Sequence, residues 1–277
     1  YEPSDAGRRG PTVTAVLAGV RILDVAEHTF VPAASSVLAD LGAEVIKVEP
    51  PTGDPQRGLL NILALFGGLI FYLLFSKSYD PNLSALRNLA QNASLPAESS
   101  PWTLFLQITF SLMFISVPIN TVASMGEEFG WRAYLLQKLM PLGGKKAVLI
   151  LGVIWGVWHW PVILMGYNYG FDYPGAPWLG LLGMAWFTIM LGIIISWLTL
   201  RSGSVWPAVI AHGAANGIGA IGLIALKGPA NTLLGPSPVG LIGGIFIAIV
   251  ALNLLFLPHA LELPHSGESE DPAVNPA

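Results

Sequence analysis

The chain has 277 residues, of which 53% are hydrophobic and only 11% charged, and it includes 31 glycines, 22 prolines and 9 tryptophans. Its mean hydropathy of +0.62 is too high for an ordinary soluble domain and predicts an all-α, polytopic membrane protein in contact with the lipid bilayer. The formal net charge of −4 comes with no basic stripe, so no nucleic-acid partner is expected, and the absence of Cys excludes disulfides, thiolate metal sites and thiol nucleophiles.

The first segment, residues 1–58, differs in composition from the rest of the chain. Val20–Val25 and Gly42–Glu49 have the composition of β-strands, and Pro32–Leu41 between them has that of a short helix. A Pro- and Gly-containing turn follows the second strand. The pattern predicts a short, soluble α/β fragment of strand–helix–strand type ahead of the helical region.

The same segment resembles the N-terminus of the class III (CaiB/BaiF-type) CoA transferases. The resemblance rests on Leu17–Asp24, Leu38–Pro50, Gly53–Pro55 and Arg57. In that family the catalytic aspartate lies well downstream, in sequence that this chain lacks, so no CoA-transferase activity is expected. One such unit also buries too little surface to be stable alone. We therefore expect a non-functional fusion, with a regulatory appendage as the alternative.

The region 59–258 contains about six apolar segments near the length of roughly 20 residues that spans a bilayer. They are Leu59–Phe75, Trp102–Met125, Ala147–Met165, Trp178–Leu200, Val205–Leu226 and Val239–Leu257. The expected architecture is a transmembrane helical bundle, and the expected location is the bacterial plasma (inner) membrane, with several passes. Residues 259–277, which are rich in Pro, Ser and acidic residues, are expected to form a disordered acidic tail.

Charged residues follow directly after the second apolar segment, in the stretch Glu127-Glu128-Phe-Gly-Trp-Arg132. Glu128 and Arg132 are four residues apart, so on a helix they share a face and can form an ion pair. Glu127 is rotated by about 100° from Glu128 and lacks that partner. It can therefore serve as a base or as a metal ligand. The alternative is a cluster of charges at a helix end, at the level of the lipid headgroups.

Two further pairs with the same spacing lie in later apolar segments. Trp155 and His159 form the first pair, and His212 and Asn216, among Gly and Ala residues, form the second. The alternatives are an aromatic belt at the membrane interface for the first pair and an interhelical hydrogen bond for the second. Polar groups inside a membrane normally face one another or a water-filled cavity, so together the three segments predict one site.

One glutamate and two histidines are a suitable set for activating water. If a metal ion is bound, Zn²⁺ is the candidate, with Glu127, His159 and His212 as ligands and a fourth position open. Without a metal, a desolvated glutamate can take the water proton itself. The sequence has no Gly-x-Ser-x-Gly elbow, no Ser beside the histidines and no His-Glu-x-x-His motif, which disfavours serine and soluble-type zinc mechanisms.

The order Glu-Glu-x-x-x-Arg, aromatic-x-x-x-His, His-x-x-x-Asn, each on a hydrophobic segment, resembles the CPBP family of intramembrane proteases, also called CAAX protease and bacteriocin-processing (Abi) proteins. The resemblance covers residues 100–226, with weaker support to residue 257. It implies that Glu127 activates the water and that His159 acts with it. It implies that His212 and Asn216 stabilise the oxyanion or help to hold a metal.

The resemblance implies supporting roles for three other residues. Glu128 and Arg132 match the rest of the first motif, with Arg132 structural through its pair with Glu128. Trp155 stands where the family usually has Phe, which keeps an aromatic ring but enlarges it.

The predicted function is that of an intramembrane endopeptidase, of the glutamate type or a metallo-endopeptidase, that acts on membrane-associated or prenylated peptides. Its partners would be a peptide or prenylated-protein substrate and the bilayer. The alternatives are a non-catalytic membrane scaffold or bacteriocin-immunity protein of the same fold, and a proton- or ion-coupled transporter. A transporter would need inverted repeats, and none is visible in the sequence.

Overall fold

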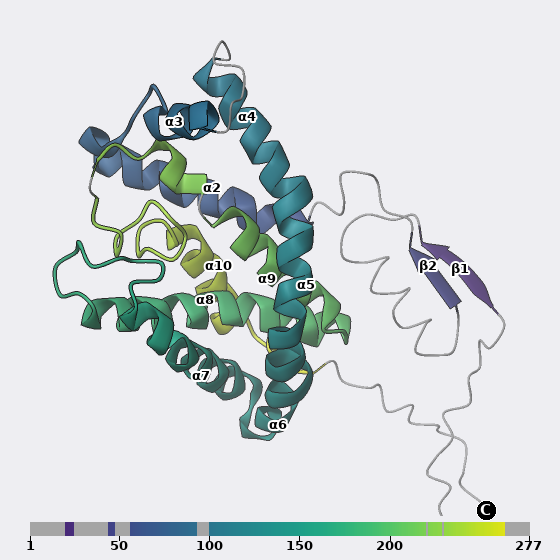
Figure 1. Ribbon diagram of the computed structural model, residues 1–277. Helices are drawn as coiled ribbons and strands as arrows, with labels where there is room; N and C mark the ends of the chain where they lie inside the picture. Colours follow the sequence, from purple (N-terminus) through teal and green to yellow (C-terminus); the bar gives the residue numbers. More distant parts are fainter. Residues whose placement is uncertain are drawn as a thin grey trace, which may run out of the picture. The chain divides into compact units, whose positions relative to one another are not determined.

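The computed structural model describes residues 20–24, 44–47, 56–92, 100–219, 221–228 and 230–263. The chain divides into two compact units, Tyr1–Gln56 and Arg57–Ala277. Nearly all regular structure among the described residues of the second unit is helical, and its helices pack into a bundle (Figure 1). The predicted all-α fold of this region is confirmed.

The first unit contains two short strands, β1 (Arg21–Asp24) and β2 (Glu44–Lys47). They pair in parallel, with Ile22 opposite Val45. Parallel neighbours need a crossover connection rather than a hairpin, which agrees with the strand–helix–strand order expected for this segment. Both predicted strands are confirmed, and the predicted helix Pro32–Leu41 lies outside the described residues.

The second unit contains an unusually long helical segment, Trp102–Leu142, of 41 residues. Its successive parts are α4 (Pro101–Ser111), the π-helical stretch η2 (Leu112–Ser116), α5 (Val117–Glu128), the π-helical stretch η3 (Phe129–Leu135), α6 (Leu136–Leu139) and the 3₁₀ turn η4 (Met140–Leu142). At about 1.5 Å per residue this segment is roughly 60 Å long, about twice the hydrocarbon thickness of a bilayer.

The charged motif lies within this helix, beyond its predicted apolar span Trp102–Met125. The helix continues through Glu127, Glu128 and Arg132, which therefore lie inside it and not at its end. Glu, Arg, Leu and Gln are good helix formers, so charge alone does not terminate a helix. The π-helical stretch η3 begins directly after Glu128, and π-helical turns are frequent at functional sites.

The remaining helices complete the bundle. They are α2 (Gln56–Leu74), η1 (Ser76–Ser78), α3 (Ser84–Asn92), α7 (Gly144–Leu164), α8 (Trp178–Ser202), α9 (Trp206–Ile218), η5 (Ile221–Ala225) and α10 (Ile245–Phe256). Within the described part of the chain, four helices are long and apolar enough to cross a membrane, namely Trp102–Leu142, Gly144–Leu164, Trp178–Ser202 and Trp206–Ala225. The expected first and last spans correspond to shorter apolar helices, Ile62–Leu74 and Ile245–Phe256. The protein is therefore an integral membrane protein.

Glycines allow two pairs of helices to approach closely. On α7, a Cβ atom added at Gly152 would lie 2.7 Å from the Cα of Ile189 in α8. On α9, a Cβ atom added at Gly213 would lie 2.5 Å from the Cα of Thr121 in α5. Small residues at such positions let helix backbones come together in membranes. The α5–α9 contact brings the polar face of α5 against α9, where the site forms.

The first residues of the predicted acidic tail pack on the bundle. Ala260 and Leu261 are buried, and the Arg201 guanidinium donates a hydrogen bond to the carbonyl of His259. The apolar side chains in this stretch explain the packing. The remainder of the predicted tail, residues 264–277, lies outside the described residues.

Candidate functional site

Glu128 and Arg132 form the predicted ion pair at the junction of α5 and η3. Nη1 of Arg132 lies 2.8 Å from Oε1 of Glu128, and both side chains are 0% exposed. The guanidinium lies beside Gly192 of α8, where an added Cβ atom would meet Nη2 of Arg132 at 3.4 Å, an ordinary van der Waals distance.

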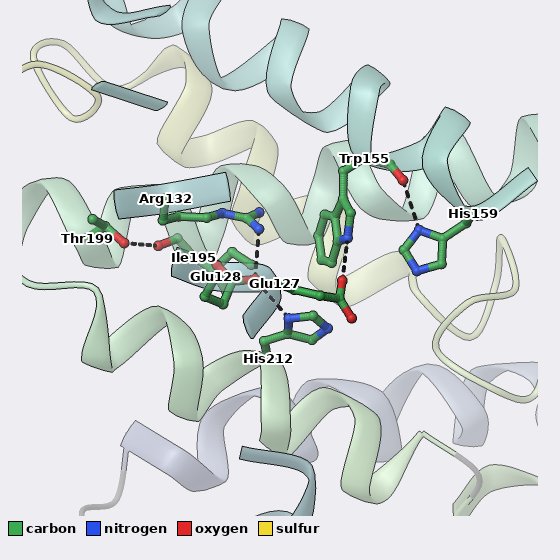
Figure 2. Close-up of polar contacts among 8 residues, drawn as sticks. All are labelled: Glu127, Glu128, Arg132, Trp155, His159, Ile195, Thr199 and His212. Atoms are coloured by element: carbon green, nitrogen blue, oxygen red, sulfur yellow. Dashed lines mark hydrogen bonds and ion pairs between the residues drawn. The ribbon is translucent and has the colours of Figure 1, made fainter. Parts of the chain in front are cut away.

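Glu128 has a second partner, which comes from α9. Nδ1 of His212 lies 2.8 Å from the same Oε1 atom, and His212 is almost completely buried. Charged groups inside a protein must be paired or desolvation destabilises them. The pair expected from the sequence is therefore a three-residue cluster of Arg132, Glu128 and His212 that joins α5 to α9 (Figure 2).

Glu127 faces a different partner. The indole Nε1 of Trp155, on α7, donates a hydrogen bond of 3.1 Å to Oε2 of Glu127. Among the described residues, no other hydrogen bond reaches the Glu127 carboxylate, which is partly exposed. The two adjacent carboxylates are thus separated, because Glu128 lies in a buried ion cluster and Glu127 keeps one oxygen available.

His159 is held by the backbone of the same tryptophan. Its Nδ1 atom lies 2.8 Å from the carbonyl oxygen of Trp155. A carbonyl oxygen can only accept a hydrogen bond, so Nδ1 carries the proton and Nε2 of the neutral ring carries a lone pair. His159 also lies within electrostatic range of both Glu127 and His212.

Trp155 contacts Glu127, Arg132 and both histidines of the site. Its ring is 1% exposed, and the guanidinium carbon of Arg132 stacks 4.5 Å from its centroid. The rings of His159 and His212 meet the indole edge-on, with centroid distances of 5.7 and 5.0 Å. Figure 2 shows the indole between Arg132 and His159, with the Glu127 carboxylate below it.

Asn216 lies one helical turn beyond His212 on α9 but does not share its environment. His212 is buried against Glu128, whereas Asn216 is exposed. Among the described residues Asn216 has no hydrogen-bond partner, so the predicted pair does not bond internally. Its amide remains available to a ligand.

A metal ion does not fit the candidate ligand set in this arrangement. In the described part of the chain, no three His, Asp or Glu side chains converge closely enough to hold one. The imidazoles themselves are oriented as metal ligands often are, each with Nδ1 bonded to an oxygen. The ligand set predicted for Zn²⁺, namely Glu127, His159 and His212, is therefore not assembled in the described part of the chain.

Comparison with known proteins separates the chain into two matches. Residues 102–218 match the family described as type II CAAX prenyl endopeptidase Rce1-like, and residues 17–74 match CoA-transferase family III. Both resemblances seen in the sequence are confirmed. All the candidate site residues fall in the first match, and the second extends past residue 58 into α2.

Individual relatives show the same division. Over an alignment of 108 residues the protein is 32% identical to CAAX prenyl protease 2 of Methanococcus maripaludis. The alignment covers 38% of this chain and 40% of that protein. Over an alignment of 62 residues it is 44% identical to formyl-CoA:oxalate CoA-transferase of Streptomyces avermitilis. This alignment covers 22% of this chain and 15% of that protein. The chain thus spans well under half the length of either relative. No solved structure matches the protein significantly.

Proposed function

Because residues 102–218 carry a domain of the type II CAAX prenyl endopeptidase Rce1-like family, we propose that the protein is an intramembrane endopeptidase. Its substrates would be membrane-associated or prenylated peptides, and its membrane would be the bacterial plasma membrane. The observation that carries this proposal is the Glu127 carboxylate, which keeps one oxygen unbonded within electrostatic range of His159 inside an apolar bundle.

In the proposed reaction, Oε1 of Glu127 takes a proton from water while the water oxygen attacks the carbonyl carbon of the scissile peptide bond. Nε2 of His159 accepts the second hydrogen bond of that water and so orients it. The resulting tetrahedral intermediate then breaks its C–N bond, and Glu127 passes its proton to the leaving amine. The hydroxyl group stays on the acyl carbon, so one water molecule is consumed.

The negative charge that develops on the carbonyl oxygen needs donors. A protonated His212 has two N–H groups, of which Nδ1–H is bonded to Glu128 and Nε2–H is available to the oxyanion. Arg132 balances the charge of Glu128. The exposed amide of Asn216 would be a second donor, and preorganised donors of this kind supply much of the rate enhancement in acyl transfer.

The proposal is tested by cleavage of a fluorogenic prenylated peptide, compared with the unprenylated peptide, by protein reconstituted in bilayers. Glu127→Gln should lower kcat by about 100-fold or more, since general-base catalysis contributes on this scale. Asp172→Asn removes an exposed carboxylate from the loop between α7 and α8 and should leave cleavage unchanged.

Two outcomes would overturn the proposal. Retained cleavage by the Glu127→Gln variant would show that this glutamate is not the base. Absence of cleavage of both peptides by the wild type would instead favour the non-catalytic scaffold or the transporter.

A further inference from the structure

We propose that Trp155 is the residue that positions the catalytic pair, because its side chain holds Glu127 and its backbone holds His159. This inference rests on the proposed function of Glu127 as the base. It goes further because it explains how a base on α5 and its partner on α7 keep one geometry. A single residue fixes both, through Nε1–H to Oε2 of Glu127 and through its carbonyl oxygen to Nδ1–H of His159.

The side-chain hydrogen bond selects which oxygen of Glu127 reacts. The indole nitrogen can only donate, and at 1% exposure it needs a partner inside the protein. That partner is Oε2, so Oε1 is the oxygen left for water. Hydrogen bonds to a charged group are stronger than those between neutral groups, which makes this bond an effective constraint on the carboxylate torsion.

Arg132 and His212 also contact the tryptophan ring and restrict its movement. The Arg132 guanidinium stacks on its face at 4.5 Å, and the ring of His212 meets its edge. Trp155 thus contacts Arg132 through its ring face and Glu127 through its N–H group, while Arg132 is bonded to Glu128.

The hydrogen bond to the Trp155 backbone fixes the tautomer and orientation of His159, the second residue of the catalytic pair. Because the Trp155 carbonyl takes the proton of Nδ1, His159 presents the Nε2 lone pair to the water. Phe at this position would keep the backbone bond and the aromatic face but would lack the N–H group. The variant Trp155→Phe consequently removes the hydrogen bond to Glu127 and leaves the backbone bond to His159 and the aromatic contacts in place.

The test compares two matched variants on α7. Trp155→Phe removes the bond to Glu127, and Trp160→Phe removes an equivalent indole bond, of 3.2 Å, to the carbonyl of Leu181. Trp155→Phe should lower kcat by about tenfold with KM changed less than about twofold, which corresponds to losing about 1.4 kcal/mol of transition-state stabilisation. Trp160→Phe should leave kcat unchanged.

A spectroscopic measurement tests the hydrogen bond without reference to activity. In protein labelled with ¹⁵N-tryptophan, the indole N–H resonance of Trp155 is assigned by its loss in Trp155→Phe. Glu127→Leu should shift that resonance upfield, because the acceptor is gone, while the Trp160 resonance stays in place.

The outcomes separate this inference from the proposed function. Equal kcat values for Trp155→Phe and Trp160→Phe would overturn the positioning role. So would a Trp155 indole resonance whose chemical shift is unchanged by Glu127→Leu. Loss of cleavage in the wild type itself would overturn the proposed function, whatever the resonance does.

Discussion

The imidazole of His212 and the carboxylate of Glu128, 84 residues apart in the sequence, form a hydrogen bond of 2.8 Å. The same Glu128 oxygen accepts from Arg132, also at 2.8 Å. A pair that is local on one helix thereby becomes the polar connection between α5 and α9. Mutations at this connection should therefore change the stability of the bundle.

Replacement of Glu128 should destabilise the protein strongly. Glu128→Gln leaves the buried Arg132 guanidinium without its counter-charge, and breaking a buried pair in this way costs about 3–5 kcal/mol of unfolding free energy. Denaturant unfolding in detergent, followed by circular dichroism, measures the loss.

The double variant Glu128→Gln/Arg132→Gln is the control for that measurement. It removes both charges, so its loss should be smaller than the sum of the two single losses. Simple additivity would show that the two side chains do not stabilise each other.

Filling the contact between α5 and α9 should damage both stability and activity. Gly213→Ala places a methyl group against the backbone of Thr121, and overpacking of this kind costs about 1–3 kcal/mol. The helices must separate, which lengthens the bond between Glu128 and His212. Unfolding and cleavage assays on the same preparation check both effects.

Gly130→Ala is the matched comparison for Gly213→Ala. A Cβ atom at Gly130 would meet nothing within 4 Å, so this variant should be neutral or more stable by up to about 1 kcal/mol, because Ala favours helix. If both substitutions destabilise the protein equally, the close contact between α5 and α9 does not explain the loss of stability in Gly213→Ala.

Removal of metal should leave cleavage unchanged. Glu127, His159 and His212 do not converge as a ligand set, and the proposed water activation uses Glu127 and His159 directly. Cleavage after treatment with a chelator and elemental analysis of the purified protein check this. Loss of activity that Zn²⁺ restores would contradict the prediction.

Acid should weaken the turn that begins α3. The hydroxyl and backbone N–H of Ser84, together with the backbone N–H of Asn82, donate to the Asp80 carboxylate and lower its pKa below the ordinary value of 3.8. Because the folded pKa is the lower one, this stabilisation is present above pH about 4 and is lost as the pH falls through the folded pKa.

The contribution of the Asp80 charge to this turn is measured by comparing wild type with Asp80→Asn. The difference in unfolding free energy between wild type and Asp80→Asn should shrink between pH 6 and pH 3. The exposed Asp172→Asn variant should show no such change. A difference that stays constant with pH would mean that the Asp80 charge contributes nothing.

Much of the fold follows from the sequence because helix formation in a membrane is local. The apolar segments at 147–165 and 178–200 coincide with α7 and α8 to within a few residues. The pair of Glu128 and Arg132 was predictable because a spacing of four residues on a helix fixes their proximity. The apolar span predicted for Trp102–Met125 is part of a longer helix, because charged residues that find buried partners do not interrupt a helix.

The arrangement of the site required the tertiary structure. Which partner each carboxylate takes depends on the registers in which α7 and α9 lie against α5. Gly213 lets α9 approach closely enough for His212 to reach Glu128. The exposure of Asn216 is likewise a matter of how α9 is rotated, which spacing on one helix does not determine.

The sequence by itself determined that this is a helical membrane protein with Glu127, Glu128, His159, His212 and Asn216 as the candidate reactive groups, because apolar run length and residue type are local properties. Only the tertiary structure decided that Trp155 binds Glu127 and that His212 binds Glu128. These contacts join helices that are far apart in the chain, and the close packing that sets their geometry depends on all of those helices at once.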